Sequence, residues 1–432
     1  MKKWLTTTID NSGLVLFRVL LGLLLVCESF GAILLGWVEA IFIQSKFTFN
    51  FIGFDFLQFL HGEKMYSYFF IMGILGLLIT IGLFYRFAMV AFTLMWTTVY
   101  LIQKESYNNH YYFLILICVI MIFLPANGKL SVDAKLFPKI KQTKIPRWMP
   151  FLLLFQVAIL YFYAAIAKLY PDWLDGTFSK ILLNGITQRK FLLDIFNQNW
   201  FLLFYAYAGI LFDLLIIPAL FWKKTRKLAI IASFGFHLFN AYSLKIGIFP
   251  FLALSFIVLL YDAIPLKFLN SKEEMAPTNT YNTKLFFVFF VPFFIIQLVL
   301  PLRHHFIKGD VLFTEEGHRL SWRMMLRERK GVLNIKVVDK KTGEFYYQNY
   351  GSELTPKQVK LLSNSPDIIW QYCQKIKKEA KKPISIFVEC SVSINRRPYY
   401  KLIDEKTDMA TAKFDYFGHN DWIVLHDFEL NP

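Results

Sequence analysis

Residues 149–173 read MPFLLLFQVAILYFYAAIAKLYPDW, a long apolar run that ends in one lysine, a proline and an aspartate. A run of this length suits a membrane-crossing helix, which needs about 20 mostly apolar residues. Pro171 should stop the helix soon after Lys168. The ammonium group of Lys168 is then either an anchor that reaches the lipid headgroups or a base held beside an apolar wall.

The composition predicts a membrane protein. Of the 432 residues, 56% are hydrophobic and 18% aromatic, and the mean hydropathy is +0.43, which is too apolar for an ordinary soluble protein. The formal net charge of +16 comes from basic residues between apolar runs. We therefore expect them to meet membrane lipid headgroups, and we expect no nucleic-acid partner. The opening MKKW, followed by polar residues and a long apolar run, is typical of a retained first helix.

The hydropathy pattern predicts about nine membrane spans. They cover residues 12–36, 66–84, 87–103, 110–125, 149–167, 199–221, 228–244, 247–263 and 285–302. Beyond residue 302 the pattern changes. The stretch GVLNIKVVDKKTGEFYYQNY (331–350) predicts two strands around a KKTG turn, and KPISIFVECSVSINRRPYYKLI (382–403) predicts a second strand pair. The predicted fold is a polytopic α-helical membrane domain (1–302) followed by an α+β, β-rich C-terminal domain (303–432).

The loop charges predict the orientation. Sixteen Lys and Arg residues fall in the segments that share the side of the N-terminus: 1–11, 85–86, 126–148, 222–227 and 264–284. Eight fall in the loops on the other side: 37–65, 104–109, 168–198 and 245–246. Because basic residues favour cytoplasmic loops, we predict a cytoplasmic N-terminus and an extracytoplasmic C-terminal domain.

Two polar clusters fall near the outer membrane face. In YNNHYYF (107–113), Asn108 or Asn109 is expected to cap a helix whose first turn contains His110. A cap with an interfacial aromatic belt would explain this motif without any function. In GFHLFNAYSLKIGIFPF (235–251), His237 and Asn240 lie one helical turn apart. Such a pair is often a packing hydrogen bond between helices, but polar groups at this depth are also functional candidates.

Lys168 shares its helix face with Ala164 and Ala165, whose small side chains leave room for a flat ring or a neighbouring helix. As an anchor, Lys168 would extend to the headgroups. As a base, it would be partly dehydrated, which disfavours the charged amine and lets the neutral form take a proton. A carboxylate of Asp172 or Asp175 close to the amine would oppose that effect.

Four cysteines occur, and none forms a CxxC pair. Cys27 and Cys118 lie in apolar runs, so we expect buried thiols. Cys373 and Cys390 lie in the polar tail and could form a disulfide if that domain faces an oxidising compartment.

Motifs of several common enzyme classes are missing from the sequence. It has no GxGxxG, P-loop or Gly-x-Ser-x-Gly motif, and no His/Cys set has metal-ligand spacing, so we expect no metal. Arg18 lies near the inner end of the first predicted span, where its side chain can reach the headgroups. Composition and spacing alone indicate a membrane protein with a polar cluster near one face and an outer domain.

A family resemblance adds to this interpretation. The segments that carry it are LFRVLLG (16–22), YNNHYYF (107–113), AAIAKLYPDWLDG (164–176), FHLFNAYSLKIGIFPF (236–251) and LSWRMM (320–325), followed by the predicted strands. In this order they resemble the vitamin K-dependent gamma-glutamyl carboxylase family and its bacterial relatives. The likeness spans nearly the whole chain.

The resemblance implies an enzyme that oxidises reduced vitamin K, a menaquinol or similar hydroquinone, with O2 to the epoxide. That reaction drives removal of a γ-proton from a glutamyl residue of a peptide or protein, and the carbanion captures CO2. The family's site is lumenal, in agreement with the charge distribution. The resemblance therefore implies an integral protein of the bacterial inner membrane with an extracytoplasmic site.

The resemblance also implies residue roles. Lys168 matches the family's catalytic base, and Asn109 and His110 match its Asn–His pair near the quinone. The quinone-pocket positions are Trp322, Met324, Met325 and Phe249, and Arg329 falls near a basic position that faces the substrate carboxylate. Asn108, His237 and Asn240 are added as cofactor-binding candidates at the same membrane level.

Two departures from the vertebrate members of the family leave an alternative function open. A vertebrate cysteine is replaced within KFTFNFIGF (46–54), and a vertebrate arginine is replaced by Asn184 in LLNGI. The alternative is a quinol epoxidase or a quinone-binding membrane protein without glutamate carboxylation. A third hypothesis is a scaffold or transporter. Against transport, the polar groups gather at one face and do not follow a path through the midplane.

Overall fold

The computed structural model describes residues 2–186, 190–244, 246–261 and 283–426. Each of the nine predicted spans falls on a helix. The structure therefore confirms a polytopic α-helical membrane protein. Among the described residues, six segments are long and apolar enough to cross a membrane: α2 (Ser12–Leu34), α3 (Lys64–Ile81), α4 (Tyr85–Ile102), α7 (Trp148–Ala167), α11 (Asn199–Phe221) and Phe287–Phe306, which joins most of α14 (Thr283–Val299) to the turn η6 (Leu300–Phe306).

Three predicted spans fall outside that set although they are helical. They are α5 (Asn109–Phe123), α12 (Arg226–Leu244), and α13 (Phe249–Ser255) with the 3-10 turn η5 (Phe256–Leu260). Short elements complete the membrane domain: α1 (Lys2–Thr6), α6 (Val132–Leu136), α8 (Pro171–Leu174), α9 (Thr177–Ile186), α10 (Lys190–Phe196) and the antiparallel pair β1 (Thr8–Asp10) and β2 (Lys144–Pro146).

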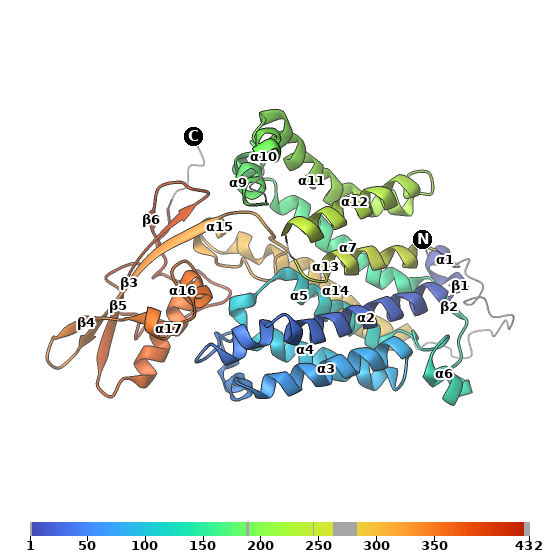
Figure 1. Cartoon of the computed structure of the whole chain (residues 1–432), viewed down its shortest axis with the longest axis horizontal. Coiled ribbons are helices and arrows are strands. Elements are labelled where there is room, and N and C mark those ends of the chain that lie inside the picture. The colour runs from blue at the N-terminus through green and yellow to red at the C-terminus, as the bar shows by residue number, and fades with distance from the viewer. Residues whose placement is uncertain (1, 187–189, 245, 262–282, 427–432) are drawn as a thin grey trace.

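Helices α2 and α3 pack lengthwise against each other (Figure 1). Glycines on both helices allow this approach. A Cβ added to Gly22 would lie 2.7 Å from the backbone nitrogen of Thr80, and one added to Gly76 would lie 3.0 Å from that of Val26. Small residues at helix contacts let backbones come close in a membrane, where packing drives helix association.

The C-terminal domain lies outside the helix bundle (Figure 1) and is called the outer domain below for that reason alone. It contains a four-stranded antiparallel sheet in the order β4-β3-β5-β6. Its strands are β3 (Arg329–Asp339), β4 (Phe345–Tyr347), β5 (Ile384–Ile394) and β6 (Tyr400–Lys401), and its helices are α15 (Val311–Thr314), α16 (Pro356–Leu362) and α17 (Pro366–Glu379). Both predicted strand pairs are confirmed, since β3 pairs with β4 and β5 pairs with β6. Alternate residues of β3 and β5, for example Ile335 and Val388, share one buried apolar core with Ile369 of α17.

Buried polar contacts hold this domain on the ends of the membrane helices, at one end of the bundle (Figure 1). Between α4 and α5, Lys104 Nζ lies 2.7 Å from Asp367 Oδ2, and Arg319 Nη1 reaches the same oxygen at 2.5 Å. The next residue, Glu105, accepts a hydrogen bond from Gln358 Nε2 at 3.3 Å. Burial lowers the pKa of Lys104 to about 8 and raises the pKa of Glu105 to about 7.

Some sequence-based expectations are wrong. Arg18 does not reach headgroups: it is 1% exposed, and it donates to the carbonyls of Ala126 at 3.1 Å and Leu130 at 2.7 Å. The loop after α5 folds back over the N-terminal half of α2 and supplies these acceptors. Cys27 is exposed rather than buried, because its face of α2 borders a cavity described below.

The other three cysteines and the remaining predicted segments are as follows. Cys118 is buried as predicted. Cys373 and Cys390 are buried free thiols, and Cys390 Sγ donates to the Ser363 carbonyl at 3.4 Å. Most of the predicted inner segment 264–284 lies outside the described residues. The domain boundary at residue 302 stays a prediction.

Candidate functional site

Helix α5 begins at the Asn-Asn-His motif. Asn108 is its N-cap, because its Oδ1 accepts from the backbone nitrogen of Tyr111 at 2.8 Å. The buried side chain of Asn109 is held at both ends: Oδ1 accepts from Tyr107 Oη at 2.9 Å, and Nδ2 donates to the Arg323 carbonyl at 3.2 Å. Asn109 therefore ties α5 to the LSWRMM segment.

The LSWRMM segment has an unusual backbone. Leu320, Trp322 and Met325 have φ of 63°, 58° and 51°, a region that residues with side chains seldom occupy. Contacts to α5 and to the turn before it hold the segment in place: the Leu320 nitrogen donates to Tyr107 Oη at 2.7 Å, and the fully buried Trp322 ring stacks on Tyr112 of α5, with 5.2 Å between the ring centroids. This anchored segment forms part of the wall of a cavity.

The cavity has a volume of about 920 Å³ and lies beside the start of α5, within the range of small-molecule sites, about 300–1,000 Å³. His110, Met324 and Met325 line it. The His110 ring stacks on Phe249, with 3.9 Å between the centroids. The remaining lining comes from residues 107–109 and 111, from 246–248, from His318 and Arg323, and from Cys27, Glu28, Gly31, Ala32, Leu35, Gly36, Trp37 and Ala40 at the end of α2.

His237 lies behind the stacked rings. It is 2% exposed, its Nε2 is 2.7 Å from Tyr161 Oη, and its ring is 6.1 Å from that of Phe249. Its Nδ1 has no partner among the described residues. A cavity of about 20 Å³ beside it has room for one water molecule. Asn240 is half-buried and lines neither cavity, so the structure does not bring it to the His110 ring.

Lys168 follows the last residue of α7 and forms an ion pair with Asp213 of α11. The two side chains are 12% and 5% exposed. The Lys168 amine also lies 3.3 Å from the Ala164 carbonyl and 5.4 Å from the centre of the Trp173 ring. Lys168 thus neither extends to headgroups nor stands free as an amine. It is not among the described residues that line the cavity of about 920 Å³.

Rings on neighbouring helices connect the ion pair to the cavity. Phe212 precedes Asp213 in α11, and its ring is 5.8 Å from that of His237. His237 in turn neighbours Phe249, on which His110 stacks. Phe212, the chain neighbour of Asp213, is therefore linked to His110 through the rings of His237 and Phe249.

The two nearby carboxylates considered from the sequence have other partners. Asp172 forms an ion pair with Arg397 and accepts from Asn395 Nδ2 at 2.6 Å. Asp175 accepts from the backbone nitrogen of Thr177 at 2.8 Å. The contacts of Asp172 tie the loop after α7 to the outer domain, so the loop that follows Lys168 is fixed.

Most hydrogen-bond donors of the Arg329 guanidinium bind carbonyl groups within the outer domain. Its Nε donates to the Asn364 carbonyl at 2.6 Å, and its Nη1 donates to the carbonyls of Phe313 at 2.6 Å and Leu312 at 3.0 Å. In the described part of the chain only Nη2 of this guanidinium is without a partner. Burial lowers the pKa of Arg329 to about 10, so the group stays charged at neutral pH.

Arg323 is the arginine that lines the cavity. Its Nε has no partner in the described part of the chain. Burial lowers its pKa to about 10, so it is a cation at neutral pH. Burial and the Arg327 guanidinium lower the pKa of the neighbouring His318 to about 3, which keeps that imidazole neutral. Despite its burial, Glu315 has a pKa held well below its usual range by its ion pair with Arg327.

Sequence reasoning missed Asp213 and Arg323. A signal for Asp213 existed, because it is the single charged residue in the apolar run 199–221. Ionisable residues inside spans usually have a partner and a function. Arg323 stands within the quoted segment LSWRMM, but nothing local to the sequence distinguishes its position from that of Arg329.

The lining of the cavity suits an aromatic ring that carries polar oxygens. The stacked His110 and Phe249 offer a flat surface with a hydrogen-bonding edge, and methionine side chains adapt to irregular ring shapes. Among the residues described, no group of three or more His, Cys, Asp or Glu side chains is placed to hold a metal ion.

Two protein-family models match the chain in succession. The HTTM domain matches residues 6–263, which places the chain among membrane proteins built on that domain. The lumenal domain of vitamin K-dependent gamma-carboxylase matches residues 282–429. The chain belongs to the vitamin K-dependent gamma-carboxylase family, as the sequence resemblance implied. No solved structure matches the chain.

Proposed function

We propose that this carboxylase-family protein binds reduced vitamin K in the cavity at the start of α5. We further propose that Lys168, which is not among the residues that line this cavity, is the base, and that the quinol hydroxyl reaches its amine directly or through one bridging water when the cofactor is bound. The observation that carries the proposal is the convergence of His110, Met324 and Met325 on one cavity, with the Phe249 ring stacked on His110. The bound hydroquinone, on oxidation by O2 to the epoxide, supplies the base strength that removes a glutamyl γ-proton before CO2 adds.

The pairing of Lys168 with Asp213 gives the lysine a route to act as a base. Two separated charges are costly in a buried site. Transfer of one proton from Lys168 Nζ to Asp213 Oδ2 leaves a neutral amine beside a neutral acid, and the amine can then accept a proton. Asp213 also fixes the position of Nζ. The opposing carboxylate is thereby part of the base.

The remaining residues orient the ring and exclude water. His110 is placed to hydrogen-bond a quinol oxygen and to stabilise the anion after deprotonation. Asn108 and Asn109 fix the start of α5 and the LSWRMM segment, and His237 supports Phe249 from behind. The helix ends and the outer domain shield the site, which protects a strong base from water.

The anionic glutamyl substrate would meet Arg323, because this cation lines the same cavity as His110. A guanidinium recognises a carboxylate by charge-assisted hydrogen bonds. We assign this role to Arg323 in preference to Arg329, whose donors are mostly occupied by carbonyls.

One observation favours the alternative function, a quinol epoxidase or quinone-binding protein without glutamate carboxylation. The arginine that the resemblance placed at the substrate has a single free donor, Nη2 of Arg329, among the described residues. The alternative needs only the quinol cavity and the Lys168–Asp213 pair. The two functions differ in a single product, the carboxylated glutamyl residue.

For the orientation, we propose a cytoplasmic N-terminus, with the cavity and the outer domain on the extracytoplasmic side of a bacterial inner membrane. The excess of Lys and Arg in the loops predicted to be inside supports this.

The proposed site is tested by epoxide formation from reduced vitamin K in air. Tryptophan at Met325, which lines the cavity and is 42% exposed, would take up space that the ring needs. We expect Met325→Trp to raise the KM for the quinol at least about tenfold, a loss of about 1.4 kcal/mol of binding. Phe306→Trp, at a position that is 84% exposed, is the matched control. An unchanged KM in a folded Met325→Trp protein would place the quinol elsewhere.

A further inference from the structure

A second cavity lies where the outer domain meets the membrane helices. Its volume is about 410 Å³, and it shares no lining residue with the cavity at the start of α5. Its walls are mostly apolar. They include Leu101 of α4, Ile115 of α5, Leu300 of η6 and Phe414 of the outer domain. A well-formed apolar cavity of this size is typical of a small-molecule site.

Exposed aromatic residues stand at this cavity. Phe54 and Phe417 line it and are 37% and 70% exposed. Phe306, at the end of the η6 turn that supplies Leu300, is 84% exposed. Large apolar side chains at the ends of membrane helices belong at the lipid interface. This end of the cavity is therefore suited to contact with the membrane surface.

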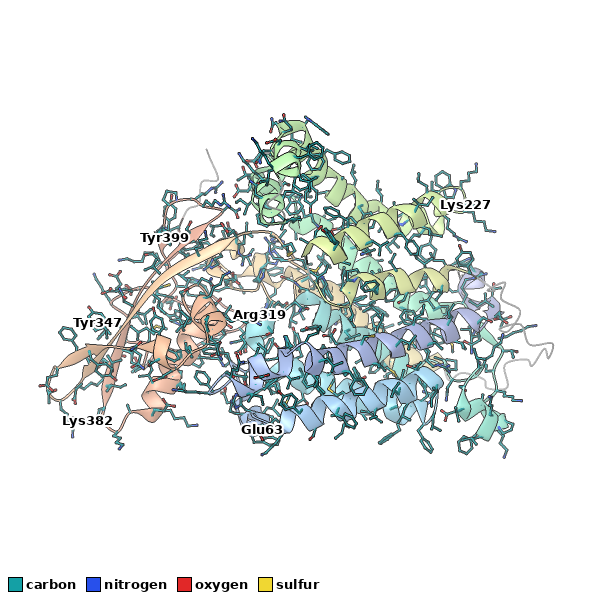
Figure 2. All side chains as sticks on the ribbon, viewed as in Figure 1. Glu63, Lys227, Arg319, Tyr347, Lys382 and Tyr399 are labelled. Carbon is teal, nitrogen blue, oxygen red and sulfur yellow. The ribbon has the colours of Figure 1, made fainter. Side chains whose placement is uncertain are left out.

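Unpartnered donors lie in the same wall. The Nε atoms of Arg303 and Arg319 are buried and have no partner in the described part of the chain. Arg303 Nη2 donates to the Arg319 carbonyl at 3.1 Å, so the two cations are close together. Arg319 lies at the junction of the outer domain and the helices (Figure 2). A buried donor without a partner is costly unless a ligand or water satisfies it.

Two of the four carboxylates that line the cavity pair with lysine or arginine side chains, and the other two accept hydrogen bonds. Glu315 pairs with Arg327, Asp367 pairs with Lys104 and Arg319, and Glu316 accepts from the side chain and backbone nitrogens of Asn420 at 2.8 Å.

Asp415, the fourth lining carboxylate, accepts from the backbone nitrogen of Phe417 at 2.8 Å. Of the lining cations in the described ranges, Arg303 is therefore the one without a carboxylate partner. The site has apolar walls and one arginine, Arg303, that pairs with no carboxylate among the described residues, and these two features suit an amphiphile with an acidic headgroup.

We propose that this second cavity binds the acyl chain of an anionic amphiphile that enters from the adjoining membrane leaflet. Its acidic headgroup lies at Arg303 and Arg319, and its chain lies between α4, α5 and the outer domain. A free fatty acid and an acidic phospholipid share this chemistry. The proposal is independent of the quinol reaction, because it uses neither the other cavity nor Lys168.

The test uses the whole purified protein in detergent and a palmitate analogue that carries a photoreactive diazirine. Crosslinked peptides are mapped by mass spectrometry, and labelling is competed with palmitate, phosphatidylglycerol and the uncharged monopalmitoylglycerol. We expect labelling on the peptides that contain Leu101, Ile115 or Phe414. Palmitate or phosphatidylglycerol should compete at least about tenfold better than the uncharged lipid, since hydrogen bonds to charged groups are worth this factor or more.

Two pairs of variants locate the site. Leu101→Trp fills the cavity and should reduce labelling at least about tenfold, while Leu94→Trp on the same helix, 64% exposed and outside the cavity, should retain it. Arg303→Gln should weaken palmitate competition, while the exposed Arg396→Gln should not.

The outcomes separate the possibilities. Competition by palmitate alone assigns a free fatty acid, and competition by phosphatidylglycerol alone assigns a membrane lipid; both support the proposal. Equal competition by the uncharged lipid overturns the role of Arg303 even if a variant fails to fold. Labelling outside the cavity, or unchanged labelling of a folded Leu101→Trp protein, overturns the site.

Discussion

Replacement of Lys168 by alanine removes the proposed base and also leaves Asp213 without its counter-charge. These two consequences can be separated, because they respond differently to a second substitution. In Lys168→Ala the Asp213 carboxylate, which is 5% exposed, loses its ion pair. In the double variant Lys168→Ala/Asp213→Asn no charge is buried at this position. The comparison distinguishes a lysine that only balances charge from a lysine that performs chemistry.

The structure sets the size of each effect. Removing one partner of a buried ion pair typically destabilises a protein by about 3–5 kcal/mol. Lys168 is 12% exposed, so we expect the lower part of that range, about 3 kcal/mol, for the single variant. The double variant should recover most of this loss. Loss of a general base costs a rate factor of about 10²–10⁴, so epoxide formation should fall by at least about 100-fold in both variants.

Thermal unfolding in detergent and epoxide formation from reduced vitamin K measure the two effects on the same samples. Lys129→Ala is the control, since Lys129 is 8% exposed and pairs with Asp10 at 3.3 Å near the other end of the bundle. It should lose stability but keep epoxide formation. If the double variant regains both stability and activity, Lys168 is a structural counter-ion and the proposed base is wrong.

Three further predictions follow from other contacts. Arg323→Gln should raise the KM for a glutamyl peptide at least about tenfold without changing epoxide formation in the absence of peptide; an unchanged KM for the peptide would remove Arg323 from substrate binding. Burial raises the pKa of Glu105 from 4.5 to about 7, so the folded state holds a proton that the unfolded state releases, and stability should fall between about pH 4.5 and 7 by up to about 3 kcal/mol. Glu105→Gln should flatten that part of the melting-temperature profile, and an identical profile would contradict the assignment. Asn109→Ala removes hydrogen bonds to Tyr107 and the Arg323 carbonyl. It should lower the stability by about 1–3 kcal/mol and should also lower kcat. An unchanged kcat would show that the LSWRMM segment keeps its position without Asn109.

The helices and strands were predictable because their signals are local. The run 149–167 predicts α7 to within one residue at its start, since apolar length alone decides a membrane helix. The alternation in β3 and β5 and the turn between Asp339 and Phe345 are likewise contained in short stretches of sequence. A cap at Asn108 or Asn109 follows from the same local rules, and the structure places it at Asn108.

The partners of charged groups were not predictable, because they are set by packing between distant segments. Lys168 and Asp213 are 45 residues apart, and the nearer Asp172 is drawn away by Arg397 of the outer domain. Arg18 looked free to reach headgroups until the loop after α5 supplied two carbonyls. Charge placement in the sequence indicated that such groups matter, but only the fold shows which of them meet.

The measurement that tests the central claim most directly supplies the purified protein with reduced vitamin K, O2, labelled bicarbonate and a glutamate-containing peptide, and follows both products. The account predicts vitamin K epoxide together with label on the peptide, and neither product from Lys168→Ala. Epoxide without labelled peptide would support the quinol reaction and contradict the proposed carboxylation. A folded wild-type protein that forms neither product would contradict the account.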